Sequence, residues 1–135
     1  MLKTTHGDAM AIIPLRAGSK GLPGKNIRPL AGKPLYLHSV DQALRVVGQC
    51  AISTDISDVL SAESPPACQL IARPPELAED QTPIAPVLMH VFEHLKQQDA
   101  LPNIAVLLQA TSPLRRDEDI RAAIALYKSG RFELV

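Results

Sequence analysis

Short apolar segments alternate with segments whose apolar residues repeat at helical spacing, and this alternation constrains the fold more than any other feature. A short apolar run bounded by turn residues is typical of a buried strand. The predicted strands cover residues 9–15 (AMAIIPL), 50–55 (CAISTD), 69–73 (QLIAR) and 103–109 (NIAVLLQ). Helical stripes are predicted over 36–47, 84–96 and 120–127, with a short helix over 56–62. Such alternation predicts an α/β fold with a mostly parallel sheet and helices on both faces.

The length of the chain is that of one domain. Its 135 residues allow a single hydrophobic core, so we treat 1–135 as one domain. The final residues, FELV (132–135), look like the opening of a further strand that no helix follows. We therefore expect an incomplete version of a larger fold, with apolar faces that self-association or a partner covers.

The composition excludes two classes of partner. Fourteen Lys and Arg balance fourteen Asp and Glu. A nucleic-acid-binding protein needs an excess of cations, so we expect no nucleic-acid partner. No apolar run approaches the roughly 20 residues of a membrane span, so we expect no membrane partner. The only cysteines, Cys50 and Cys68, are expected to be reduced core thiols of a cytoplasmic protein.

A basic, glycine-rich segment follows the first predicted strand. Between Asp8 and Asp41 there is no acidic residue, whereas five lysines and arginines and several glycines occur there. Glycine lets backbone N–H groups approach an anion, and Lys and Arg add positive charge. In a parallel sheet, ligands bind beyond the carboxyl ends of the strands, where this segment begins. The pattern fits neither a Walker A loop nor G-x-G-x-x-G, but it predicts a phosphate-binding loop, with a solvated basic loop as the alternative.

The sequence of this segment resembles the motif of a known family. Residues 11–35 (AIIPLRAGSKGLPGKNIRPLAGKPL) resemble the N-terminal motif of the acylneuraminate cytidylyltransferases, or CMP-sialic acid synthetases. Further blocks follow in the same order: ISTD at 52–55, ARPPELAEDQTP at 72–83 and VLLQATSPLRRDEDI at 106–120. The chain resembles the N-terminal half of such a protein. The resemblance implies a Rossmann-like nucleotidyltransferase in which the hydroxyl of a sialic-acid-like sugar attacks the α-phosphate of CTP, giving CMP-sugar and pyrophosphate.

The resemblance also implies a role for individual residues. Arg16 and Lys25 would be catalytic, holding the triphosphate. Nucleotide binding would fall to Gly18, Ser19, Lys20, Asn26, Arg73, Asp80 and Thr82. Sugar binding would fall to Gln109, Thr111, Ser112 and Arg115. Thr111 and Ser112 could equally cap a turn or helix, and Arg115 could either meet the sugar carboxylate or join the charged start of a helix.

The resemblance implies Mg²⁺ as cofactor, and CTP and an acidic nine-carbon sugar as partners. The uncovered apolar faces and sheet edge of an incomplete fold lead us to expect a homo-oligomer. The family's metal-binding aspartates lie in the C-terminal half, so no metal ligand is expected here. The motif HVFEH (90–94) matches an inverted zinc-protease motif, but helical spacing places its polar residues away from the apolar stripe. Two other functions remain open: a related nucleotidyltransferase with another nucleotide or acid sugar, and a truncated, non-catalytic nucleotide-binding protein.

Overall fold

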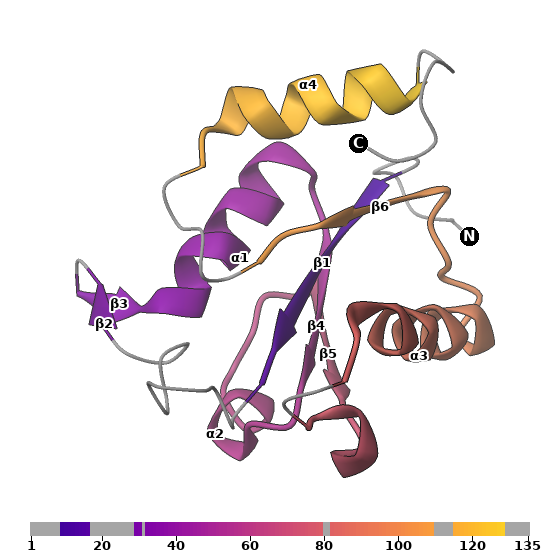
Figure 1. The fold of residues 1–135 in the computed structure, drawn as a ribbon. Coiled ribbons are helices and arrows are strands. Elements are labelled where there is room, and N and C mark those ends of the chain that lie inside the picture. The colour runs from indigo at the N-terminus through magenta and orange to yellow at the C-terminus, as the bar shows by residue number, and fades with distance from the viewer. Residues whose placement is uncertain (1–8, 17–28, 31, 80–81, 110–114, 129–135) are drawn as a thin grey trace.

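The computed structural model describes residues 9–16, 29–30, 32–79, 82–109 and 115–128, and all structural statements concern these residues. Their elements are shown in Figure 1. In chain order they are β1 (Ala9–Leu15), β2 (Pro29–Leu30), β3 (Lys33–Pro34), α1 (Leu35–Val46), β4 (Cys50–Thr54), α2 (Ser57–Leu60), β5 (Cys68–Ala72), a 3₁₀ turn (Pro75–Leu77), α3 (Ile84–Gln97), β6 (Ile104–Leu107) and α4 (Asp117–Lys128).

Four strands form one parallel sheet in the order β5-β4-β1-β6. The central strand β1 pairs with β4 on one side, where Ala11 lies opposite Cys50, and with β6 on the other, where Ala9 lies opposite Ile104. The chain therefore builds the sheet outward from β1 through β4 to β5 and then returns to place β6 beside β1. The predicted parallel sheet is confirmed.

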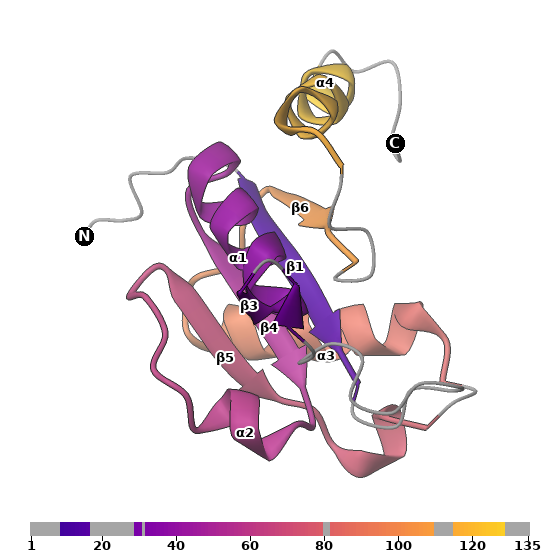
Figure 2. The ribbon, with the colours of Figure 1, turned by 90° about the vertical axis from the view of Figure 1, so that its left-hand side faces the viewer.

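Helices cover both faces of the sheet, as Figure 2 shows. Alternate β1 residues point to opposite faces, because side chains in a strand alternate. Ala11, Ile13 and Leu15 pack with residues of α1, α2 and α4. Met10 and Ile12 pack on the other face, with Val91 and Leu95 of α3. No helix in the described parts of the chain has the length and apolarity to cross a membrane.

The helices match their predicted stripes closely. Val87, Val91 and Leu95 form the buried side of α3, whereas Ile84 at its first turn is exposed. The acids expected near the start of the last helix lie in the first turn of α4, where the helix dipole favours negative charge. Gly48 follows α1 with φ of 104°, a left-handed conformation that suits glycine after a helix end.

Two expectations need correction. The run 103–109 is apolar almost throughout, which is typical of a strand covered on both faces. In the structure β6 is shorter and lies at the edge of the described sheet, with Ala105 and Leu107 exposed. An apolar run looks the same whether its neighbours are present or absent, which explains the error. We also proposed no strand between residues 16 and 34, whereas the short antiparallel pair of β2 and β3 lies at the end of this segment.

Candidate functional site

The carboxyl ends of the four parallel strands define the candidate site. The order of strands reverses between β1 and β6, and ligands of open α/β sheets bind beyond the carboxyl ends at such a point. Arg16 directly follows β1, Asp55 follows β4, Arg73 follows β5, and Gln109 lies just past β6. The fold thus brings three of the predicted site residues, Arg16, Arg73 and Gln109, to one edge of the sheet.

Arg73 is the most firmly held of these residues. Its side chain is buried, with the residue 7% exposed. The guanidinium Nε donates to Ser53 Oγ at 3.3 Å, and Nη2 donates to the Ser53 carbonyl oxygen at 3.0 Å. The Arg73 backbone N–H donates to the Thr54 carbonyl at 2.8 Å. The end of β4 therefore fixes the position of this cation.

Electrostatics link the ends of three strands. Burial lowers the pKa of Arg73, because a desolvated guanidinium loses the solvation of its charge. The negative charge of Asp55 opposes this effect, and the positive charge of Arg16 adds to it. The ends of β1, β4 and β5 therefore carry two cations and one carboxylate whose charges act on one another. Two cations gathered in this way favour binding of an anion with more than one charge.

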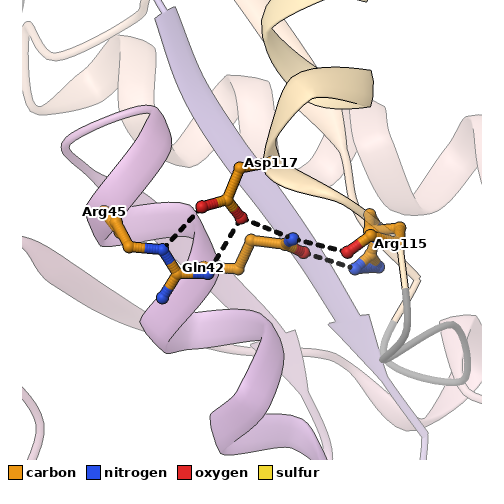
Figure 3. A network of polar contacts seen from close by, with 4 residues as sticks. All are labelled: Gln42, Arg45, Arg115 and Asp117. Atoms are coloured by element: carbon orange, nitrogen blue, oxygen red, sulfur yellow. Dashed lines mark hydrogen bonds and ion pairs between the residues drawn. The ribbon is translucent and has the colours of Figure 1, made fainter.

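Arg115 belongs to a polar network between α1 and the start of α4, shown in Figure 3. Its Nη1 donates to Gln42 Oε1 at 3.1 Å, and its Nη2 donates to the backbone carbonyl of Gln109. Gln42 Nε2 in turn donates to the Arg115 carbonyl at 2.8 Å and to Asp117 Oδ1 at 2.9 Å. Arg45 completes the network: its Nε donates to Asp117 Oδ2 at 2.8 Å, and its Nη2 donates to Asp117 Oδ1 at 2.9 Å. The network ties the end of β6 to α1.

The remaining predicted residues divide between described and undescribed parts of the chain. Thr82 is half-buried ahead of α3, and its N–H donates to the Glu79 carbonyl at 3.0 Å. The Gln109 side chain is exposed. The other predicted site residues lie outside the described residues: Gly18, Ser19, Lys20, Lys25, Asn26, Asp80, Thr111 and Ser112. Their roles stay predictions.

The described residues do not provide a ready site for Mg²⁺. Within them, no group of three or more His, Cys, Asp or Glu side chains is placed to hold a metal ion. In the HVFEH motif, His90 is half-buried with an unpaired buried Nδ1, Glu93 is exposed, and His94 Nε2 lies 3.2 Å from Gln98 Nε2.

An apolar cavity of about 780 Å³ runs along the outer side of β6. Leu88 and Phe92 of α3 line it on one side, and Ile124 and Tyr127 of α4 on the other. Arg115 lies on its wall and is one of the few charged residues there. The exposed edge of β6 thus carries an apolar hollow beside the carboxyl end of the strand.

Sequence reasoning missed the residues that support the arginines. Ser53 and Asp55 lie within the block ISTD, and their place at the end of a strand was the available signal. Gln42 had no signal of its own, because it is a single glutamine in an amphipathic helix. Its two partners lie 73 and 75 positions further along the chain.

The parallel sheet with helices on both faces is a fold of the nucleotidyltransferase type. A solved structure of CMP:2-keto-3-deoxy-manno-octonic acid synthetase complexed with CTP superposes with a TM-score of 0.74. The two chains are 26% identical, and the match covers 91% of this chain and 48% of the other. Residues 10–133 match the cytidylyltransferase family, and the chain belongs to that family.

Curated relatives agree with this assignment. The CMP-N,N'-diacetyllegionaminic acid synthase of Legionella pneumophila is 39% identical over 126 residues, which cover 88% of this chain and 53% of the relative. The N-acylneuraminate cytidylyltransferase of Streptococcus agalactiae serotype III is 35% identical over 124 residues, which cover 89% of this chain and 29% of the relative. The chain therefore spans about half, or less, of the length of these relatives.

Proposed function

We propose that this chain is the nucleotide-binding part of a cytidylyltransferase that activates an acidic, sialic-acid-like sugar with CTP. In the proposed reaction the sugar hydroxyl oxygen attacks the α-phosphorus of CTP and loses its proton. The bond from that phosphorus to pyrophosphate breaks, leaving CMP-sugar. One observation carries the proposal: Arg16 and Arg73 gather beyond β1 and β5 in a chain of the cytidylyltransferase family.

The nucleotide would lie over the carboxyl ends of β1, β4 and β5. Arg16 would neutralise triphosphate charge together with Lys25 of the basic segment, as charge development in phosphoryl transfer requires. Arg73, fixed by Ser53, would line the nucleotide pocket with Thr82. Because β4 holds its guanidinium in place, Arg73 would bind without first paying the entropy of ordering a long side chain.

The sugar would lie on the β6 side of the switch point, near Gln109 and Arg115. Relatives named for legionaminic, acylneuraminic and pseudaminic acids support an acidic sugar as the class of acceptor. All of these sugars carry a carboxylate, and Arg115 is the described cation nearest in sequence to the end of β6.

We include Mg²⁺ in the proposal only as the ion that accompanies the triphosphate. The described residues offer no cluster of ligands for it. Triphosphate oxygens of CTP would supply part of its coordination, and the resemblance assigns the protein ligands to the C-terminal half of the family's domain. Comparing CTP affinity with Mg²⁺ and with EDTA tests this point. Equal affinity under both conditions would remove Mg²⁺ from the proposal.

We further propose a homo-oligomer located in the cytoplasm. The open edge of β6 and the exposed Leu107 beside the apolar cavity support self-association. Two buried, unbridged thiols support a reducing compartment. The hydrogen bond with Cys68 and burial raise the pKa of Cys50, so this thiol stays protonated and unreactive. Light scattering should give a mass above that of a monomer, and replacement of Leu107 by Asp should lower it.

The experiment that tests the function separates nucleotide binding from turnover. Calorimetry with CTP, UTP, ATP and GTP should give measurable binding for CTP and weaker binding for the others. Pyrophosphate release from CTP with N-acetylneuraminic acid then tests catalysis, which we expect to be negligible for the 135 residues alone. Absence of CTP binding would refute the nucleotide-binding assignment. Preference for another nucleotide would assign the chain to a different branch of nucleotidyltransferases.

A further inference from the structure

Arg115 carries a positive charge that the described residues do not neutralise. The two groups that accept hydrogen bonds from its guanidinium, Gln42 Oε1 and the Gln109 carbonyl, are both uncharged. No carboxylate of the described residues accepts a hydrogen bond from it. Burial lowers its pKa, and no carboxylate of the described residues counteracts this effect. A half-buried guanidinium held only by neutral acceptors retains a strong preference for an anion.

A carboxylate does lie close by, but other groups occupy it. Asp117 is two residues from Arg115, and both of its carboxylate oxygens accept hydrogen bonds from Arg45. Gln42 Nε2 donates to the same carboxylate. These bonds hold the pKa of Asp117 well below its usual range, so it stays ionised and paired. The carboxylate of Asp117 therefore neutralises Arg45 of α1 and not Arg115.

Gln42 lies between Arg115 and Asp117 and bonds to both, because one side-chain amide has both a donor and an acceptor. Its Oε1 accepts a hydrogen bond from Arg115 Nη1, and its Nε2 donates to Asp117 Oδ1 and to the Arg115 carbonyl, as Figure 3 shows. The residue is buried, 6% exposed, so its orientation is fixed by packing as well as by hydrogen bonds. A glutamate at this position would add a negative charge beside the guanidinium, and an apolar residue would leave the guanidinium unsupported.

We propose that Gln42 and Arg45 are positioning residues that keep Arg115 oriented and unneutralised as a receptor for the carboxylate of the acidic sugar. Arg115 lies beyond the carboxyl end of β6 and on the wall of the cavity, at the side of the switch point assigned to the sugar. Asp119, which lines the same cavity, pairs with Arg116 at 3.3 Å. This inference rests on the proposed function and specifies which group recognises the charge of the sugar.

The test compares a charged ligand with an uncharged one. N-acetylneuraminic acid and its methyl ester differ in the carboxylate, so the ratio of their dissociation constants, measured by NMR titration in the presence of CTP, reports recognition of charge. The wild-type chain should bind the acid about tenfold or more tightly than the ester, the range for a charge-assisted hydrogen bond. Both Gln42→Glu and Arg115→Met should reduce this ratio to near one.

Gln49→Glu is the matched control. Gln49 is a half-buried glutamine that follows the same helix, and its Nε2 donates to the Ala9 carbonyl at 3.1 Å, at the amino end of β1 and far from the proposed sugar site. The same change of charge there should leave the preference for the acid intact. Thermal unfolding of all variants identifies any that fail to fold, and Gln42→Met, which adds no charge, replaces Gln42→Glu in that case and should lower the ratio as well.

The outcomes separate the two proposals. If the wild-type chain binds CTP but does not prefer the acid to the ester, the inference is refuted and the nucleotide site stands. If a folded Gln42→Glu protein keeps the full preference, Gln42 is merely structural and the inference is also refuted. If the chain binds no CTP, the proposed function fails. A shift of the Arg115 Nε resonance on addition of sodium acetate, abolished in Gln42→Glu, would then still support the receptor, and its absence would overturn it.

Discussion

Replacing Arg73 with methionine tests the candidate nucleotide site most directly. Methionine has a similar length and is apolar, so it can fill the buried space without the charge. The change removes two hydrogen bonds to Ser53, one to its hydroxyl and one to its carbonyl. It also removes a cation that lies beside Asp55 and Arg16 at the ends of the strands.

Two opposing contributions determine the effect on stability. Each hydrogen bond to a charged group contributes about 1.5–3 kcal/mol to stability. Removing the buried charge also removes its desolvation penalty, which offsets much of the loss. We therefore expect the free energy of unfolding to fall by about 1–2 kcal/mol, a change that urea unfolding resolves. CTP affinity should fall by roughly 10- to 100-fold, since one charge-assisted contact to the nucleotide is lost.

Two further variants isolate the cause. Arg73→Lys keeps the charge but loses the forked geometry, so its affinity should lie between those of the wild type and Arg73→Met. Arg116→Met makes the same substitution at a side chain that is 73% exposed and directed to Asp119, and it should leave CTP affinity unchanged. A folded Arg73→Met protein that binds CTP as tightly as the wild type would refute the assignment of Arg73 to the nucleotide site.

Three other predictions follow from the described contacts and from the basic segment. Arg16→Ala and Lys25→Ala should each weaken CTP binding by about 1.5–3 kcal/mol in calorimetry, and unchanged affinity in both would refute the phosphate-binding loop. Hydrogen bonds from Arg45 lower the pKa of Asp117, so Asp117 stabilises the fold above its unfolded pKa of about 4 and loses this effect as pH falls. The advantage of the wild type over Asp117→Asn, from urea unfolding at pH 7 and pH 3, should shrink at pH 3, whereas a constant difference would contradict the pairing. Leu95→Ala, at a side chain with no exposed surface, should cost about 2–5 kcal/mol, and a loss below about 0.5 kcal/mol would contradict its place in the core.

Periodicity was sufficient to predict most elements of the sheet and its helices. The apolar run at Ala9–Leu15 and the stripe ending at Leu95 each fit a single kind of element, because burial on the sheet or on one helix face dictates their spacing. The exposure of β6 could not be predicted. An apolar sequence shows that a strand favours burial, but it does not show which neighbouring elements are present to bury it. The hairpin of β2 and β3 was too short for any periodicity.

The candidate site was predictable where a functional residue follows a strand directly. Arg16 and Arg73 are such residues, and the topology of a parallel sheet brings them to the same edge. The supporting residues were not predictable, because Gln42 and Asp117 meet only after α4 has packed beside α1. Contacts between distant segments depend on tertiary packing, which one sequence does not encode in any local pattern.

The central position of β1 has a consequence for how the chain folds during synthesis. Its first neighbour, β4, leaves the ribosome early, but its second neighbour, β6, is made only after β5 and α3. At about 5–20 residues per second, the apolar edge of β1 waits roughly 5 to 20 seconds for Ile104 to reach Ala9. Pairing across so long a stretch of chain also closes a large loop, which slows folding. The nascent β1 edge is thus the place where aggregation competes with folding, and where a chaperone that binds apolar segments would act.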